Sequence, residues 1–368
     1  MEVQAPQSPS LEDLATAVGE AAERLAPFLP VTPLRKSLWL SDLLDAEVWL
    51  KCENLQPTGS FKVRGALNKL VQEVGNAGSS DVLPLRVVAA STGNHGAAVA
   101  FATRRMAETV DADDGLSCEG TATCTVFVPE GTASAKLSNM QRLGAEIRVV
   151  GTDSLECEIA ARAFAQDEGA LYVSPYNDPL VVAGQGTAAV EIDQQLEAAG
   201  RDSADVVVAS LGGGGLISGL AAGVRLWRPR AGNGSGPLVV AASPERSKVM
   251  HESVRAGRIL DLASEPTLSD GTAGGVEPGA VTFGWARDGV GAFVLVSEDE
   301  IARTLYACVV EERLLVEGAA AVAIAGAASP DLRERIRGKT VVVVLCGANV
   351  PAGKLSGLLE EHGAGAER

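Results

Sequence analysis

Three stretches of this chain carry groups that could do chemistry, and the first holds a single lysine, Lys62. It follows Phe61 and a Gly-Ser turn, where the pattern predicts that a helix begins. A lysine at a helix start meets the positive end of the helix dipole, and burial also disfavours its charge. Both effects lower the pKa of the amine toward the free base that a nucleophile needs. A solvated surface lysine is the ordinary alternative.

Four consecutive glycines, Gly212, Gly213, Gly214 and Gly215, follow the apolar run 206–209 and precede a predicted helix. Such a turn can aim several backbone N–H groups at one anion, with the helix N-terminus behind them. No Gly-Lys-Ser/Thr follows, which excludes a nucleoside-triphosphate loop, and the glycine spacing is wrong for a dinucleotide fold. We therefore predict a phosphate cradle. A tight strand–helix turn with a packing role alone is the alternative.

A third stretch, Ser91-Thr92-Gly93-Asn94-His95, lies where an apolar strand pattern gives way to a helical one. Two hydroxyls and the N–H groups of a helix start suit a carboxylate. The plain alternative is a capped helix with Ser91 or Thr92 at the N-cap, and both interpretations can hold together. His95 alone is more often a structural histidine than a catalyst.

Length and composition limit the classes of protein to consider. A chain of 368 residues predicts two domains or one large one, and a net charge of −16 argues against nucleic acid or an anionic membrane as a partner. No apolar run reaches the roughly 18 residues of a membrane span, and the N-terminus lacks the features of a signal peptide, so we expect a cytoplasmic protein. Six cysteines without a C-x-x-C pair, and three histidines, argue against zinc and predict free thiols.

The elements that must position these stretches alternate between strand and helix, which predicts an α/β fold with doubly wound parallel sheets. We expect residues 81–178 to form a small domain inserted into a larger one, built from residues 1–80 and 179–368. A crevice between the two is the expected ligand site, and closure over a substrate is expected. No internal repeat is found.

Finer expectations concern single segments. The helix predicted over 154–166 should have Leu155, Ile159, Ala163 and Phe164 on its apolar side. The predicted strand 341–346 should be buried on both faces. Residues 243–291 look irregular, whereas 111–120 and 230–236 look like exposed loops.

Taken together, and in this order along the chain, the three stretches resemble the fold-type II pyridoxal-phosphate enzymes, within them the threonine/serine dehydratase and serine racemase group. The resemblance extends from about Thr32 to Asn349. It implies a tryptophan synthase β-like fold with two doubly wound parallel-sheet domains. It also implies pyridoxal 5'-phosphate as cofactor, a small amino acid as substrate, and a homodimer.

The resemblance also assigns roles to residues. Lys62 would form an imine with the cofactor aldehyde and later move protons at Cα, and Phe61 would pack against the cofactor, although an ordinary core aromatic is nearly as good an interpretation. Gly212, Gly213, Gly214 and Gly215 would hold the phosphate. Asn94 would face the ring hydroxyl. Ser91, Thr92, Gly93, Asn94 and His95 would bind the substrate carboxylate.

Two further positions follow from the same resemblance. Cys346 would face the pyridine nitrogen, and because a neutral thiol cannot keep that nitrogen protonated, prompt loss of a β-leaving group is favoured. A thiol that only fills space is the alternative. Glu317 would lie near the ring, with a helix-dipole partner as the equal alternative.

The chain departs from the group's pattern at two places. Relatives that bind a divalent cation carry an acidic residue before the proline that follows the phosphate-loop helix, where this chain has Ser243-Pro244-Glu245. We therefore predict no metal there. Racemases of the group use a serine at the position matched by Thr92, and the stiffer threonine lowers the expectation of racemisation. The regulatory domain of biosynthetic threonine dehydratases is not expected.

The function predicted is a pyridoxal-phosphate-dependent ammonia-lyase that dehydrates and deaminates a β-hydroxy amino acid to a 2-oxo acid and ammonia. An amino-acid racemase is the near alternative, and a nucleotide-binding α/β protein without the cofactor is the distant one. Serine, threonine, 3-hydroxyaspartate and phenylserine all stay open, because the small residues of segment 270–279 could mean room for a substituent or only close backbone approach.

Overall fold

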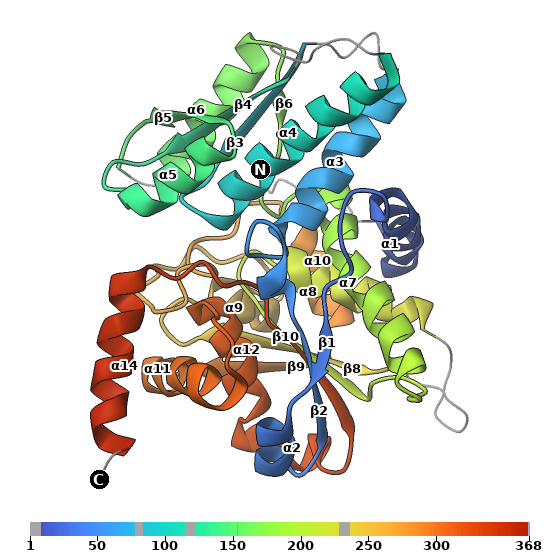
Figure 1. Ribbon diagram of the computed structural model, residues 1–368, viewed down its shortest axis with the longest axis vertical. Coiled ribbons are helices and arrows are strands. Elements are labelled where there is room, and N and C mark those ends of the chain that lie inside the picture. Colours follow the sequence, from blue (N-terminus) through green and yellow to red (C-terminus); the bar gives the residue numbers. More distant parts are fainter. Residues whose placement is uncertain (1–8, 78–83, 115–121, 153, 228–235, 367–368) are drawn as a thin grey trace.

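Two β-sheets organise the chain (Figure 1). The four-stranded sheet lies in the upper half of that view and the six-stranded sheet in the lower half. The computed structural model describes residues 9–77, 84–114, 122–152, 154–227 and 236–366.

The larger sheet has the strand order β1-β2-β10-β7-β8-β9, and every pair is parallel except β1 with β2. All residues of β7 and residues 341–344 of β10 are buried, because helices cover both faces of these valine-rich strands. The strands are β1 (Leu34–Lys36), β2 (Glu47–Lys51), β7 (Val206–Ser210), β8 (Leu238–Pro244), β9 (Ala292–Val296) and β10 (Thr340–Val344).

The smaller sheet is parallel throughout, in the order β5-β4-β3-β6. Strand and helix alternate along it, as the sequence predicts, so the carboxyl ends of its strands meet at one edge. Its strands are β3 (Leu85–Ala90), β4 (Ala122–Val128), β5 (Ala145–Val149) and β6 (Leu171–Tyr172).

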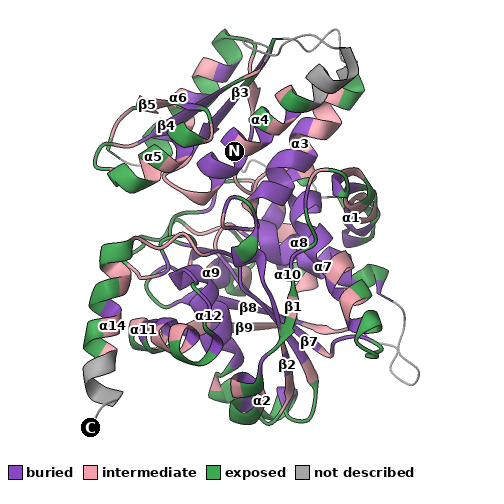
Figure 2. Ribbon diagram, viewed as in Figure 1, coloured by how far each residue is buried: buried purple, intermediate pink, exposed green. Residues whose placement is uncertain are grey.

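Helices flank both sheets, and Figure 2 shows buried ribbon concentrated in the strands and in the helices between the sheets. The longer helices are α1 (Leu11–Leu25), α2 (Leu38–Leu44), α3 (Lys62–Ala77), α4 (Asn94–Asp114), α5 (Ser134–Arg142), α6 (Ser154–Asp167), α7 (Pro179–Ala198), α8 (Gly215–Gly223), α9 (Val249–Ala256), α10 (Val281–Gly289), α11 (Glu298–Ala307), α12 (Gly318–Ala327) and α14 (Ala352–Ala366). The short ones are η1 (Glu53–Leu55), η2 (Val224–Leu226), η3 (Cys308–Glu312), η4 (Pro330–Leu332) and α13 (Arg333–Ile336).

The predicted apolar side of α6 is wrong. Leu155 and Ile159 are 65% and 61% exposed, whereas the buried face consists of Cys157, Ala161 and Ala165. Small side chains let α6 lie close to the sheet, and the two large aliphatic residues project to solvent. The buried face was assigned wrongly because the largest apolar residues were expected to be buried. The helix itself was predicted correctly.

Other segments differ from the sequence prediction in their secondary structure. The supposedly irregular stretch 243–291 contains α9 and α10, and α9 ends at Gly257, whose φ of 71° suits glycine. Residues 111–114, predicted as part of a loop, continue α4. The remainder of that loop, residues 115–120, and most of the predicted loop 230–236 lie outside the described residues.

The core of the smaller sheet includes residues from outside segment 81–178. Leu25, Val63, Leu67 and Leu70 are buried together with residues of β3, β4 and α4. Helix α3 thus contributes its apolar face to this core, although it precedes the predicted boundary at residue 80. The division into domains 1–80 with 179–368 and 81–178 stays a prediction.

Helices α3, α7 and α8 contact one another through glycines. A Cβ on Gly184 of α7 would lie 2.7 Å from the Cα of Gly65 in α3, and one on Gly219 of α8 would lie 2.6 Å from the backbone N of Gly186 in α7. The helix backbones touch directly at these points, because no larger residue fits. The two contacts fix α3, which begins at Lys62, relative to α8.

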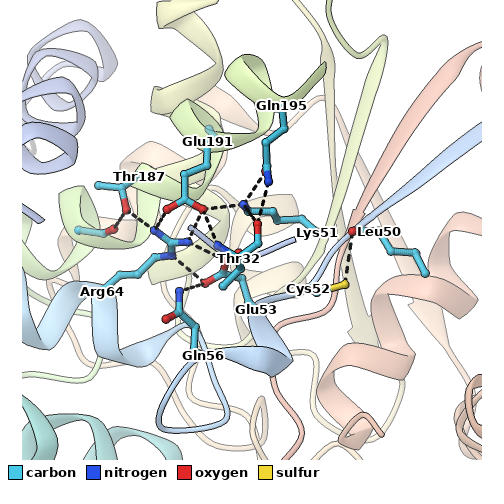
Figure 3. Close-up of polar contacts among 12 residues, drawn as sticks. Thr32, Leu50, Lys51, Cys52, Glu53, Gln56, Arg64, Thr187, Glu191 and Gln195 are labelled. Atoms are coloured by element: carbon cyan, nitrogen blue, oxygen red, sulfur yellow. Dashed lines mark hydrogen bonds and ion pairs between the residues drawn. The ribbon is translucent and has the colours of Figure 1, made fainter. Parts of the chain in front are cut away.

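A buried ionic network, formed by Lys51, Glu53, Arg64 and Glu191, holds α3 to β2 and α7 (Figure 3). Arg64 Nε lies 2.7 Å from Glu53 Oε2 and its Nη1 lies 2.7 Å from Glu191 Oε1, while Lys51 Nζ lies 2.6 Å from Glu191 Oε2. Two cations thus balance two carboxylates. The side chains of Lys51 and Glu53 are completely buried, so removal of one partner would leave an unpaired charge out of water.

Candidate active site

Lys62 is the first residue of α3, and backbone contacts with the end of β10 hold the turn before it. Gly59 has a φ of 71°, Ser60 forms a β-bridge with Gly347, and the N–H of Phe61 donates to the carbonyl of Cys346 at 3.0 Å. These backbone contacts fix the position of Lys62 relative to β10.

The ammonium of Lys62 donates to the carbonyl oxygen of Pro175 at 2.7 Å. Burial lowers the pKa of this amine to about 8, against the smaller opposing influence of Cys346 and Glu317. A pKa near 8 leaves a useful fraction of free base near neutral pH, which is what a nucleophile or general base requires.

The four glycines, Gly212–Gly215, connect β7 to α8. Gly214 has a φ of 89°, and a Cβ on Gly213 would lie 2.6 Å from the ring of Tyr176. The Thr282 hydroxyl donates to the carbonyl of Gly213 at 2.7 Å. Close packing therefore requires glycine at these positions, as expected for a tight strand–helix turn. The first N–H groups of α8 also have no acceptor within the helix, so the turn offers donors to an anion.

Pro175 and Tyr176 bring Lys62 and the glycines together. The carbonyl oxygen of Pro175 that accepts from Lys62 also lies 3.9 Å from the position of a Cβ on Gly215, and Tyr176 covers the same glycines. Lys62 and Gly213 line one cavity of about 1760 Å³, together with residues 91–95. The three stretches singled out in the sequence therefore meet in space.

Residues 91–95 line that cavity where β3 is followed by α4, whose first two residues are Asn94 and His95. The hydroxyl of Ser91 accepts from the N–H of Gly93 at 3.1 Å, a local cap of the helix start. Ser91, Thr92, Gly93 and Asn94 are all half-buried and line the cavity. Helix-start N–H groups and hydroxyls thus face the space where a ligand can bind.

His95, by contrast, has a structural contact. Its Nε2 lies 2.8 Å from the carbonyl oxygen of Val173, and the side chain is buried. Burial, with the charge of Lys62, lowers the pKa of the ring to about 3, so the imidazole is neutral. Its role in substrate binding stays a prediction.

Glu317 and Asn94 form the floor of the cavity. Asn94 Nδ2 donates to both carboxylate oxygens of Glu317, at 2.8 and 3.0 Å, and its Oδ1 accepts from Asn349 Nδ2 at 2.7 Å. Burial raises the pKa of Glu317 to about 7, against the opposing Asn94 hydrogen bond. Glu317 occupies the N-cap position of α12 without a side-chain cap, so its carboxylate serves Asn94 instead of the helix start.

Cys346 and Phe61 lie beside residues that line the cavity, Glu317 and Lys62. The Cys346 thiol is buried, accepts from Ser210 Oγ at 3.5 Å and lies 4.0 Å from Glu317 Oε1, and burial raises its pKa. It is therefore a neutral group beside the cavity floor. Phe61 packs against the core of the larger sheet, with Lys62 Nζ 5.3 Å from its ring centroid. This position favours the core-aromatic interpretation, and its contact with a cofactor stays a prediction.

Sequence reasoning missed Tyr176, Thr282 and Asn349 as parts of the site. Tyr176 and Thr282 hold the glycines, and Asn349 orients Asn94 while donating to the carbonyl of Thr58 at 3.0 Å. Asn349 is the last residue of the stretch that resembles the family, and this was the signal in the sequence that could have identified it. The other two are distant in sequence, and no local pattern marks them.

No three His, Cys, Asp or Glu side chains gather as a metal site within the described part of the chain. At the position considered above for a cation ligand, the Ser243 hydroxyl is buried and donates to the carbonyl of Leu211 at 3.2 Å, and Glu245 is exposed. The expectation of no metal stays a prediction. Among the described helices, none has the length and apolar character of a membrane crossing.

Comparisons with known proteins agree with this geometry. A model of the family described as pyridoxal-phosphate dependent enzyme matches residues 25–347. The L-threonine ammonia-lyase of Geobacter sulfurreducens is 36% identical over 345 residues, covering 94% of this chain and 78% of that protein.

Two solved structures extend the likeness to three dimensions. The threonine deaminase from T.th. superposes with a TM-score of 0.78 at 31% identity, over 93% of this chain and 99% of that one. Serine racemase from Dictyostelium discoideum superposes with a TM-score of 0.76 at 27% identity, over 92% and 98%.

Proposed function

Because the chain belongs to the pyridoxal-phosphate dependent enzymes, with the fold-type II architecture, we propose that it converts a β-hydroxy amino acid such as threonine or serine to a 2-oxo acid and ammonia. The likeness to an L-threonine ammonia-lyase supports this activity. Family membership removes the distant alternative of a nucleotide-binding protein without the cofactor.

The residues present fit the cofactor. A glycine turn at a helix start suits its phosphate, Lys62 offers a low-pKa amine for its aldehyde, and Asn94 offers an amide for its ring hydroxyl. The Cys346 thiol suits an unprotonated ring nitrogen. When bound, pyridoxal phosphate supplies a ring that accepts the electron pair left when a proton leaves Cα.

The observation that carries the proposal is the position of Lys62. Its amine lies in one cavity with the glycine cradle and residues 91–94, and burial lowers its pKa to about 8. The amine can therefore take a proton from the Cα of an amino acid whose carboxylate lies on the N–H groups of residues 91–94. Hydroxide then leaves from Cβ, and water hydrolyses the released product to the 2-oxo acid and ammonia.

The role of Lys62 is tested with Lys62→Ala, assayed after supplementation with cofactor. We expect no 2-oxo acid from threonine or serine, because the variant lacks the amine that would react with the cofactor aldehyde and take the Cα proton. The matched control is Lys69→Ala on the same helix, whose ammonium pairs with Glu73 and Asp178 and which should keep turnover. Substantial 2-oxo acid formation by the Lys62 variant would contradict the assignment.

Racemisation is the second candidate, and it rests on Thr92, which lines the same cavity as Lys62 and has a hydroxyl able to carry a proton. Chiral analysis of unreacted threonine or serine separates the two activities. Incubation with serine, threonine, 3-hydroxyaspartate and phenylserine, followed by measurement of 2-oxo acid, identifies the preferred substrate.

We further propose a cytoplasmic homodimer. Four buried cysteines with free thiols support a reducing compartment: Cys52, Cys124, Cys308 and Cys346. Likeness to the family supports the dimer, and light scattering of the purified protein tests it.

A further inference from the structure

Lys136, on α5, stands over the loop that we propose binds the substrate carboxylate. Its side chain lines the cavity, and a Cβ on Gly93 would lie 3.8 Å from its Nζ. Because Gly93 has no side chain, no atom of a side chain at that position lies between the Lys136 ammonium and the backbone of residues 91–94.

The carboxylate that pairs with Lys136 comes from a part of the chain that is 134 residues away in sequence. Lys136 Nζ lies 2.8 Å from Oδ2 of Asp270, in the segment between α9 and α10. That segment continues along the cavity floor, since a Cβ on Gly271 would lie 3.3 Å from Glu317 Oε1. Both charges also shift the pKa of Glu317, after burial and Asn94: Asp270 upward and Lys136 downward.

The ion pair of Lys136 and Asp270 is too exposed to contribute much to the stability of the fold. Its side chains are 25% and 42% exposed, and exposed pairs contribute little to folding because water and salt screen them. A substrate carboxylate on residues 91–94 would be a second anion beside Glu317, which Asn94 contacts directly. A cation at Gly93 offsets that repulsion.

We propose that Lys136 is a substrate-binding residue: it pairs with the α-carboxylate of the amino acid, and Asp270 is the counterion that the carboxylate displaces. The inference extends the proposed function by naming the group that Lys136 recognises. Asp270 competes with substrate for one ammonium, so the two members of the ion pair have opposite effects on substrate affinity.

The first test compares Lys136→Gln with Asp270→Asn in the holoenzyme, with threonine or the best substrate of the panel. Loss of a charged hydrogen bond should raise KM for Lys136→Gln about tenfold or more, with a smaller change in kcat. Asp270→Asn should lower KM, because Lys136 loses its competitor. Lys136→Arg keeps the charge and should recover much of the affinity.

A purely structural ion pair predicts a different result. Either substitution breaks the same bridge, so both variants would then change KM in the same direction and by similar factors. That result would overturn the proposal, and so would an unchanged KM in Lys136→Gln. Unfolding temperatures of both variants should stay near that of the wild type, since the side chains are partly exposed.

A second test does not need turnover. Binding of threonine and of threoninol, in which a hydroxymethyl group replaces the carboxylate, is followed through the absorbance of the bound cofactor. The wild type should prefer threonine, and Lys136→Gln should lose most of that preference; an undiminished preference would refute the role of Lys136. If no amino acid yields a 2-oxo acid, the proposed function fails, and the threonine preference still decides the role of Lys136.

Discussion

Glu53 and Glu317 are both buried glutamates, and their surroundings shift their carboxyl pKa in opposite directions. Burial alone would raise the pKa of Glu53, but the charge and hydrogen bonds of Arg64, with Lys51 and Thr32, outweigh it and hold the value near 2. Glu317 receives an amide hydrogen bond from Asn94 without a paired cation, and burial raises its pKa to about 7.

The opposite pKa shifts distinguish a glutamate that stabilises the fold, Glu53, from one in the candidate active site, Glu317. In the buried ionic network each carboxylate has a cation, so its charge state is fixed and α3 is held in place (Figure 3). At the cavity floor the carboxyl group can gain or lose a proton near neutral pH, and its partners are neutral. Substitutions at four positions test this contrast.

The largest effect is expected for Arg64→Met, which removes the shared cation of Glu53 and Glu191. Buried Glu53 and half-buried Glu191 would then share Lys51, and the free energy of unfolding should fall by about 3 to 5 kcal/mol. Urea unfolding followed by circular dichroism measures the change. The control, Arg104→Met, removes an exposed arginine paired with Glu108 and should cost less than about 1 kcal/mol. Equal losses in both variants would contradict a structural role for the network.

Glu53→Gln isolates the carboxylate with the lowered pKa. A folded pKa of about 2 against the usual 4.5 stabilises the native state above pH 4.5, and this contribution disappears as the pH falls toward 2. The shift corresponds to about 3 kcal/mol. The gap in unfolding free energy between wild type and variant should therefore be widest at pH 7 and shrink below pH 4.5. A gap independent of pH would rule out the charge as its cause.

Glu317→Gln should show the opposite pH dependence. A folded pKa raised to about 7 gives stability that is complete below pH 4.5 and is lost as the pH rises through 7. In the cofactor-free protein the variant, which keeps an acceptor for Asn94, should gain relative to the wild type by no more than about 3 kcal/mol at pH 8. The gain should vanish at pH 4. A variant less stable at pH 8 than at pH 4, relative to wild type, would contradict the assigned environment.

Cys346→Ser is expected to have the smallest effect. The thiol and the hydroxyl are both neutral, and Ser210 can donate to either. Elimination should continue at the same order of magnitude, with little change in stability. Cys346→Asp, in contrast, would place a second carboxylate close to Glu317 and should slow the elimination, as measured by 2-oxo acid release.

The sequence predicted the parts of this site that local patterns encode. Lys62 lies at a helix start, residues 91–94 follow β3 of the smaller sheet, and the four glycines follow β7 of the larger sheet. Strand–helix alternation therefore places the last two stretches at the carboxyl ends of their own sheets. The buried face of α6 was predicted wrongly, because Leu155 and Ile159 are large but exposed.

Other features depend on pairs of residues far apart in the chain. Arg64 and Glu191, Asn94 and Asn349, and Lys136 and Asp270 each join segments more than 100 residues apart. The fold determines these partners, and no periodicity within a window of sequence contains them. The ionic network was missed for this reason, and so was the orientation of Asn94.

The glycine contacts that join α3, α7 and α8 have a consequence for adaptation. At these contacts the backbone of one helix touches the backbone of the next, so there is no side chain to exchange. Mutation there cannot change the distance between the Lys62 amine and the four glycines by small steps. The distance between Lys62 and the four glycines is therefore set by contacts that tolerate no larger residue. Changes in the shape of the cavity have to arise elsewhere in its lining, on the loop after β3, on α5 or on the segment that carries Asp270.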